Sequence, residues 1–137
     1  MKKSMKYTLC AVLVIILVVF IAIFSNPLRW SDAYVRNHVL KLTPIGMSME
    51  DVIVVIEGQE AWETRYIDYE SGYLSRGPLV PDRPVSFSGY SIIGEKSIRA
   101  LVGEYKYLLV TSVTVFWGFD ENSELIEVEV WKTVDGP

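Results

Sequence analysis

The longest run of hydrophobic positions lies near the start of the chain. Residues 8–24 contain no charged side chain, and Lys2, Lys3 and Lys6 precede them. At about 1.5 Å per residue a helix of this length reaches roughly 26 Å, the short end of what spans a bilayer. Residues 7–24 are therefore predicted to form a transmembrane helix in contact with the lipid bilayer.

A cleaved secretory signal is the alternative for this segment. The apolar core of such a signal is usually about 7–15 residues long, and this run is longer. No clear small-x-small site follows it, and Pro27 restrains the backbone where a peptidase needs an extended substrate. We therefore favour an uncleaved signal-anchor over residues 1–26. The lysines keep the N-terminus in the cytoplasm, which makes this a single-pass protein of the cell membrane with an extracytoplasmic domain over 27–137.

Two short helices are predicted at the start of that domain. Apolar residues at spacings of four and three predict the first helix over 32–42. Ser48, with Asp51 three residues later, forms a capping-box pattern that predicts the second helix over 48–57. Gly58 is suited to end it.

Strand character dominates after these helices. β-Branched and aromatic residues are frequent in four segments, which we predict to be strands: 62–70, 97–105, 111–119 and 125–133. Residues 71–94 contain four glycines and three prolines and are predicted to be a long loop, stiffened by prolines at a spacing of three. The fold class is therefore α+β, with two short helices packed on one face of an antiparallel sheet of about four strands.

The last two predicted strands form a hairpin whose register follows from the hydrophobic pattern. With a four-residue loop at 121–124, apolar residues pair on one face: Phe119 with Ile126, Trp117 with Val128, and Val115 with Val130. A five-residue loop would set Trp117 against Glu127. Because a slip of one residue moves every side chain to the other face, we select the four-residue loop. The second face then holds Thr114, Phe116, Leu125, Glu127, Glu129 and Trp131.

Composition changes at the end of the apolar run. The whole chain of 137 residues has a net charge of −4, but the part after residue 24 holds 17 acidic and ten basic residues and carries −7. Binding to nucleic acid requires Lys and Arg that neutralise phosphates, so we expect no nucleic-acid partner. Cys10 is the only cysteine and lies within the apolar run, so no disulfide is expected in the extracytoplasmic domain.

The domain lacks the residue patterns of common catalytic and metal sites. His38 is the only histidine, and no nucleophile lies at a recognisable elbow, so we expect no enzyme. Oxygen-bearing side chains gather at 120–124, but their spacing is not that of a calcium-binding loop, and a solvated hairpin tip is favoured. No cofactor and no metal site are predicted.

The second face of the hairpin combines large aromatic side chains with carboxylates. A solvent-exposed sheet face usually carries polar side chains, and Trp is frequent among the residues that dominate binding at protein–protein interfaces. The predicted binding face therefore consists of Thr114, Phe116, Glu127, Glu129 and Trp131. The alternative is that Trp131 only packs against Phe116, or that the 71–94 loop covers both. If the face is a binding site, its acidic rim favours a basic protein partner.

Two short motifs carry a resemblance to a known fold. Ile45-Gly46-Met47-Ser48 opens the predicted second helix, and Phe119-Asp120 followed by Leu125 ends one strand and begins the next. With the order of two helices and then antiparallel strands, residues 40–135 resemble the β-lactamase-inhibitor-protein-like (BLIP-like) fold. The secreted β-lactamase inhibitor proteins and the SmpA/OmlA (BamE) outer-membrane assembly lipoproteins share that fold. The sequence of 114–120 resembles that of small uncharacterised membrane-anchored bacterial proteins. This resemblance implies that the protein is located in a bacterial cell envelope.

Together these patterns indicate a binding protein rather than a catalyst. We expect a non-enzymatic module for protein binding or envelope assembly that uses the open second face of the sheet. The alternative is a structural accessory subunit of a membrane complex, recruited through its transmembrane helix.

Overall fold

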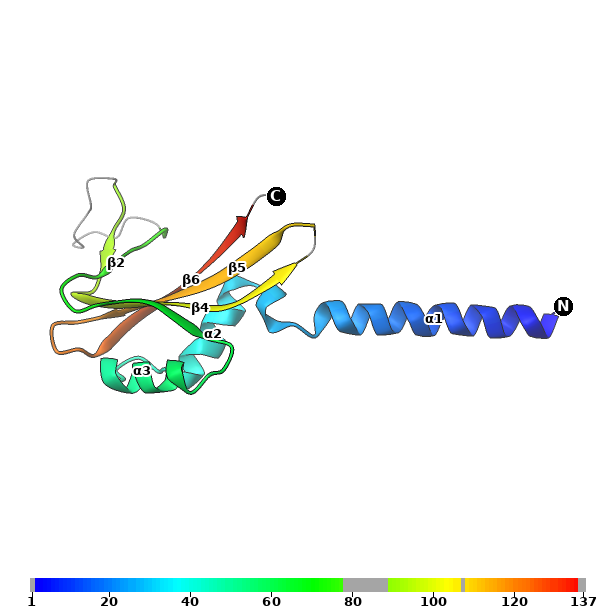
Figure 1. Cartoon of the computed structure of the whole chain (residues 1–137), viewed down its shortest axis with the longest axis horizontal. Coiled ribbons are helices and arrows are strands. Elements are labelled where there is room, and N and C mark those ends of the chain that lie inside the picture. The colour runs from blue at the N-terminus through cyan, green and yellow to red at the C-terminus, as the bar shows by residue number, and fades with distance from the viewer. Residues whose placement is uncertain (1, 78–88, 107, 136–137) are drawn as a thin grey trace.

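The N-terminal segment forms a single long helix that stands apart from the rest of the chain. The computed structural model describes residues 2–77, 89–106 and 108–135. Helix α1 (Lys2–Phe24) projects from the folded domain and packs against no other element along its apolar length (Figure 1). The stretch Met5–Phe24 is long and apolar enough to cross a membrane. This helix has the features of a signal-anchor or of a signal sequence.

Two further helices follow, as predicted. A 3₁₀ turn, η1 (Pro27–Arg29), leads into α2 (Asp32–Leu42), and α3 (Met49–Glu57) comes next. The side chain of Ser31 accepts a hydrogen bond from the backbone N–H of Tyr34, and that of Ser48 accepts one from Asp51. These caps satisfy backbone donors that the first turn of a helix leaves unpaired, which is why both helices begin there.

Four strands form an antiparallel sheet in the order β1-β4-β5-β6, and both helices pack on one of its faces. We call this the inner face and the opposite one the outer face. The strands are β1 (Glu63–Asp68), β4 (Lys96–Lys106), β5 (Val110–Phe119) and β6 (Leu125–Asp135). The predicted α+β class, with two helices on one face of an antiparallel sheet, is confirmed.

The main core lies between the helices and the inner face. Trp117 of β5 is fully buried at its centre, and its indole N–H donates a hydrogen bond of 3.0 Å to the hydroxyl of Thr43, which follows α2. That hydroxyl in turn donates to the backbone oxygen of Val39 at 3.0 Å. The one polar atom of the indole is therefore satisfied inside an apolar core, as burial requires.

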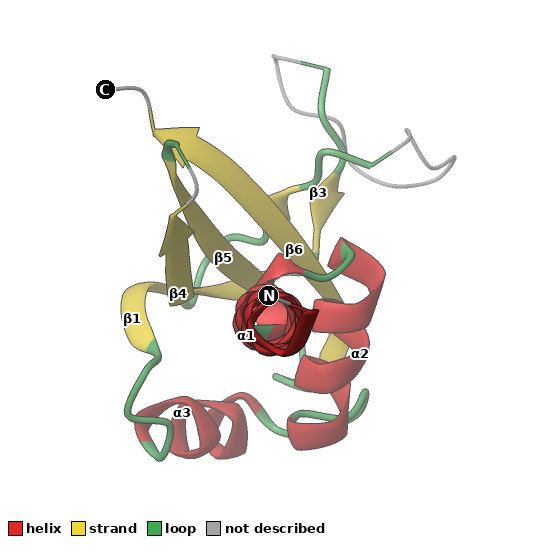
Figure 2. Ribbon diagram, turned by 90° about the vertical axis from the view of Figure 1, so that its right-hand side faces the viewer, coloured by secondary structure: helices red, strands yellow, loops and turns green. Residues whose placement is uncertain are grey.

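The prediction that 71–94 is only a loop was wrong at both of its ends. Strands β2 (Tyr73–Leu74) and β3 (Ile92–Ile93) pair with each other in a small separate sheet. This hairpin and the helices α2 and α3 lie on opposite sides of the main sheet (Figure 2). The three prolines that were expected to stiffen the loop lie at 78–84, outside the described residues.

The register of the β5–β6 hairpin was predicted correctly along most of its length but not at its turn. Trp117 pairs with Val128, as expected, but Phe119 pairs with Leu125 instead of Ile126. The turn therefore has five residues, 120–124, and a β-bulge restores the register beyond it. Leu125 consequently lies in the core, not on the outer face as predicted, and Ile126 is 42% exposed.

A carboxylate holds this longer turn in place. One oxygen of Asp120 accepts hydrogen bonds of 2.9 Å from the backbone N–H groups of Asn122 and Glu124. Ser123 adopts a positive φ of 62°, a conformation that closes tight turns. A local side-chain interaction of this kind leaves no trace in the hydrophobic pattern, so the pattern alone selected the wrong loop length.

Candidate binding site on the outer face

The five residues predicted to form a binding face lie together on the outer face of the sheet. Thr114 pairs with Trp131, Phe116 with Glu129, and Gly118 with Glu127. Phe116 and Trp131 are diagonal neighbours, as predicted, and their ring centroids are 4.3 Å apart. Strand alternation alone produces this grouping, because all of these side chains leave the same side of β5 and β6.

The outer face is not open at Phe116, which corrects the expectation of an open sheet face. Only 7% of Phe116 is exposed, because Tyr73 and Ile93 of the β2–β3 hairpin pack over it. The Tyr73 and Phe116 ring centroids are 5.4 Å apart. Phe116 is therefore part of a small second core. The alternative prediction, that the 71–94 segment covers this residue, is correct for Phe116.

A glycine on β5 makes room for this covering hairpin. A Cβ atom on Gly118 would lie 2.9 Å from Cγ2 of Ile93 and 3.0 Å from Cε1 of Tyr73. Both distances are below ordinary van der Waals separations, so a larger residue would displace the hairpin. Gly118 therefore allows the hairpin to approach the sheet closely enough to bury Phe116.

Trp131 is half-buried between the ring of Phe116 and the guanidinium group of Arg76. The guanidinium carbon of Arg76 lies 3.9 Å from the centroid of the Trp131 ring, on a segment that follows β2. One oxygen of Glu129 accepts a hydrogen bond of 2.7 Å from the Trp131 indole and one of 2.9 Å from the backbone N–H of Arg76. Glu129 thus positions both Trp131 and Arg76.

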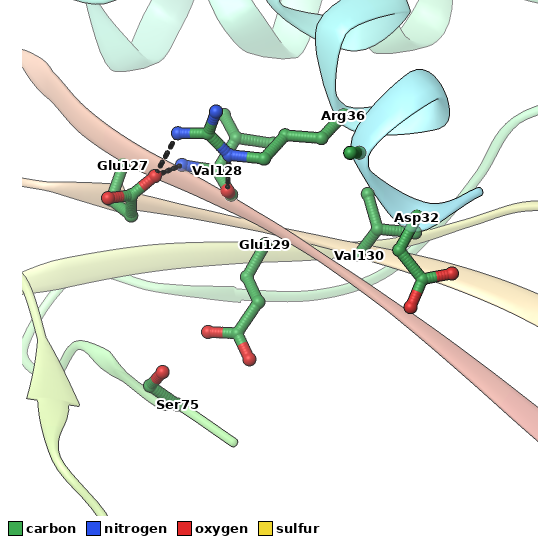
Figure 3. A pocket seen from close by; sticks show the side chains of 8 residues that line it. Asp32, Arg36, Ser75, Glu127, Val128, Glu129 and Val130 are labelled. Atoms are coloured by element: carbon green, nitrogen blue, oxygen red, sulfur yellow. Dashed lines mark hydrogen bonds and ion pairs between the residues drawn. The ribbon is translucent and has the colours of Figure 1, made fainter. Parts of the chain in front are cut away.

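A cleft of about 350 Å³ lies beside β6, and we call it the carboxylate cleft. Arg36 of α2 reaches around the edge of the sheet, where it pairs with Glu127 and donates a hydrogen bond of 2.8 Å to the backbone oxygen of Val128 (Figure 3). The side chain of Glu129 points away from Arg36, towards Ser75 (Figure 3). The cleft is lined by Asp32, Ala33, Arg36, Ser75, Glu127, Val128, Glu129 and Val130.

The carboxylates of this first cleft already have partners. Glu127 pairs with Arg36, Glu129 accepts from the Trp131 indole, and Asp32 lies 3.5 Å from the Nζ atom of Lys132. These contacts join α2 and the segment after β2 to the edge strand. The main role of the carboxylates is therefore to hold the architecture of the site together.

A second cleft, of about 210 Å³, lies on the outer face next to Trp131, and we call it the arginine cleft. It is lined by Arg76, Arg99, Thr114, Phe116, Trp131 and Thr133. The guanidinium carbon of Arg99 lies 6.0 Å from the centroid of the Phe116 ring. In the part of the chain that the structure describes, neither guanidinium group takes part in an ion pair.

The side chains that line the arginine cleft are chemically suited to bind an anion. Guanidinium groups present several N–H donors in a planar fork that matches carboxylate and phosphate groups. Thr114 and Thr133 add hydroxyl groups that can donate or accept, and the lining contains no His, Cys, Asp or Glu to act as base or nucleophile.

Sequence reasoning found three members of this cleft and missed both arginines. Arg99 stands at an outward position of a predicted strand, so the alternation of 97–105 was a usable signal for it. Arg76 is 55 positions from Trp131 and belongs to a segment that was predicted to be a loop. No local pattern could place it against that ring.

Outside these clefts the described residues that bear on catalysis or metal binding are the one histidine and the possible metal ligands. His38 is exposed on α2, where it lies near Tyr34, Asn37 and Lys41. Among the described residues, no three His, Cys, Asp or Glu side chains are arranged to hold a metal ion.

Comparisons of the chain with protein-family models, with curated proteins and with solved structures find no significant match. The resemblance to the BLIP-like fold therefore stays a prediction. The functional argument depends on the geometry of the site alone.

Proposed function

We propose that this chain is a membrane-anchored, non-enzymatic module that binds an acidic segment of an extracytoplasmic protein in the arginine cleft. The observation that carries the proposal is the pair of guanidinium groups, on Arg76 and Arg99, that stand over aromatic rings with no carboxylate partner among the described residues. A guanidinium group against an aromatic surface is partly removed from water, which strengthens its attraction to an incoming carboxylate.

An acidic partner replaces the basic one that the acidic rim of the predicted binding face suggested. The domain carries −7, but the carboxylates nearest to the cleft are engaged with Arg36, Lys132 and the Trp131 indole. The side chains that line the arginine cleft itself are two arginines, two threonines and two aromatic residues. Local composition decides recognition here, because charges more than about 8–10 Å away are largely screened at physiological salt.

The anchor sets where this binding takes place. We propose that α1 remains attached as a signal-anchor and that the lysines before its apolar stretch keep the N-terminus in the cytoplasm. The arginine cleft then lies outside the cell membrane, on a domain that extends beyond the end of α1 (Figure 1).

Site-specific photo-crosslinking in native membranes tests the proposal. A photo-reactive residue at Thr133, which lines the cleft, should give a discrete protein adduct, whereas one at Val54, exposed on α3, should not give the same adduct. Changing both arginines (R76Q with R99Q) should lower the adduct yield about tenfold or more, since it removes two charge-assisted contacts. An adduct that survives this change at full yield would contradict the proposed function.

Two controls separate binding from folding and from recruitment by the helix. Arg36→Gln removes a cation of the neighbouring carboxylate cleft and should leave the adduct in place. Replacing residues 7–24 by an unrelated apolar helix should also leave it in place. Loss of the adduct in the second control would instead support a structural accessory subunit that is recruited through its transmembrane helix.

A further inference from the structure

The turn between β4 and β5 exposes apolar side chains where turns usually carry small or polar ones. Leu108 is 94% exposed and Leu109 is 39% exposed. Turns in water favour Gly, Asn, Asp, Ser and Pro, each for a backbone reason, and leucine satisfies none of these. Two consecutive leucines that are exposed in this way are suited to an apolar environment outside the domain.

This turn is attached directly to the point where α1 ends. The guanidinium of Arg29, in η1, donates to the backbone oxygen of Lys106 at 3.3 Å and to that of Ile23 at 3.4 Å. One side chain thus bridges the last turn of α1 and the end of β4. The end of β4 and the start of β5 lie on the side of the domain that faces α1 (Figure 1).

Packing reinforces this junction. Leu28 lies over Gly103 of β4, where an added Cβ atom would be only 2.5 Å from the Cδ1 atom of Leu28. The indole N–H of Trp30 donates to the backbone oxygen of Phe24 at 3.1 Å, so the chain after α1 folds back onto its end. The domain is therefore held against the helix by contacts on both sides of the linker.

The side chains around the junction have the character of a membrane interface. Trp30 and Tyr34 have ring centroids 4.2 Å apart and are 42% and 39% exposed. Trp and Tyr are enriched where a bilayer meets water, because their rings are apolar and their N–H or O–H groups are polar. Arg29 and Lys106 add cations that suit lipid phosphates at the same level.

We propose that Leu108 and Leu109, the two residues before β5, form a second membrane contact and insert into the interfacial region of the leaflet from which α1 emerges. The proposal rests on the placement of α1 in the bilayer but not on the arginine cleft. The bilayer is the occupant because Arg29 ties Lys106, two residues before Leu108, to the last turn of α1, which brings the exposed leucines close to the end of the membrane-spanning stretch. Two contacts with one leaflet limit rotation of the domain and so hold the outer face in one orientation.

Fluorescence of the full chain in lipid vesicles tests this contact. In a Cys10→Ser background, an environment-sensitive dye is attached at Leu108→Cys and, as a matched control, at Val54→Cys, whose native side chain is 66% exposed on α3. In phosphatidylcholine vesicles with phosphatidylglycerol, the dye at 108 should shift to shorter wavelength. It should also be quenched about twofold or more by lipids brominated on their acyl chains, and the dye at 54 should not.

A third label distinguishes failure of the turn contact from failure of the anchor. A dye at Leu13→Cys, within α1, should be quenched whenever the helix lies in the bilayer. Quenching at 13 without quenching at 108 would overturn the turn contact and leave the anchor standing. Absence of quenching at both positions would overturn both. Leu109→Asp should reduce the quenching at 108 several-fold, whereas Val54→Asp should leave it unchanged, if the neighbouring leucine shares the contact.

Discussion

Phe116 and Trp117 are neighbours on β5, yet they belong to cores of different size and construction. Trp117 points to the inner face and is one of fifteen buried residues that come from α2, α3 and the main sheet. Phe116 points to the outer face and shares a cluster of three buried residues with Tyr73 and Ile93. The inner face is covered by two capped helices, and the outer face by a hairpin whose strands have two residues each.

The difference explains why the inner face stabilises the fold and the outer face holds the candidate site. A large core buries most of its apolar surface, and the hydrophobic contribution scales roughly with that area. The β2–β3 hairpin, whose strands have two residues each, covers only one end of the outer face. Trp131 therefore stays half-buried, and Arg76 and Arg99 stay exposed beside it. Incomplete covering is what leaves a cleft there.

The largest expected effect comes from the inner face. Trp117→Ala should lower the free energy of unfolding by about 3–5 kcal/mol, because it opens a cavity and leaves the Thr43 hydroxyl without its donor. Chemical denaturation of the full chain in a mild detergent measures this loss. A change below about 1 kcal/mol, the range of a surface substitution, would contradict the central place of Trp117 in the core.

The adjacent substitution on the outer face should cost less. We expect Phe116→Ala to lower the free energy of unfolding by about 2–3 kcal/mol, because the outer cluster is small and can partly collapse. The same denaturation experiment compares the two variants directly. A loss as large as that of Trp117→Ala would show that the two faces stabilise the fold equally.

A substitution at Gly118 should loosen the covering hairpin without entering the inner core. Gly118→Ala places a methyl group in the space that Ile93 and Tyr73 occupy, and we expect a loss of about 1–2 kcal/mol from overpacking. Hydrogen exchange should quicken at 73–74 and 92–93 but not at 113–117. Equal quickening in both segments would mean that the hairpin and the main sheet open as one unit.

The smallest effect is expected at the edge of β6, where the two faces meet. Arg36→Gln removes the pair with Glu127 and should cost about 1 kcal/mol or less, since both side chains are about one-third exposed. The cost should fall as salt is raised. Arg65→Gln is the matched control, because its pair with Glu63 is more exposed, and it should leave the unfolding midpoint unchanged. Equal losses in the two variants would remove any special role for Arg36.

The parts of the fold that were predicted correctly are those with a repeating local signal. Ser31 and Ser48 begin the two helices because a capping side chain acts within three residues of itself. Val115 and Trp117 pair with Val130 and Val128 because alternation along a strand allows only one register with both apolar sets on one face. In both cases the deciding interaction either joins residues close together in the sequence or is repeated many times along the element.

The errors fall where a single contact outweighs the pattern. Asp120 closes a five-residue turn with its own side chain, and the resulting bulge moves Leu125 into the core. Strands β2 and β3 are too short for alternation to be visible, so the segment was predicted to be a loop. The prediction of the candidate site missed Arg76 for the same reason, because the path of that segment brings Arg76 against the Trp131 ring.

By itself the sequence determined the apolar N-terminal helix, the α+β class, the two capped helices and the composition of the inner face, because each depends on periodicity and local chemistry. Only the tertiary structure decided that Tyr73 and Ile93 bury Phe116 and that Arg76 stacks on Trp131. These contacts join segments that are more than 20 and up to 55 positions apart. Their geometry depends on how the intervening chain runs and on the space that Gly118 leaves, which no local pattern encodes.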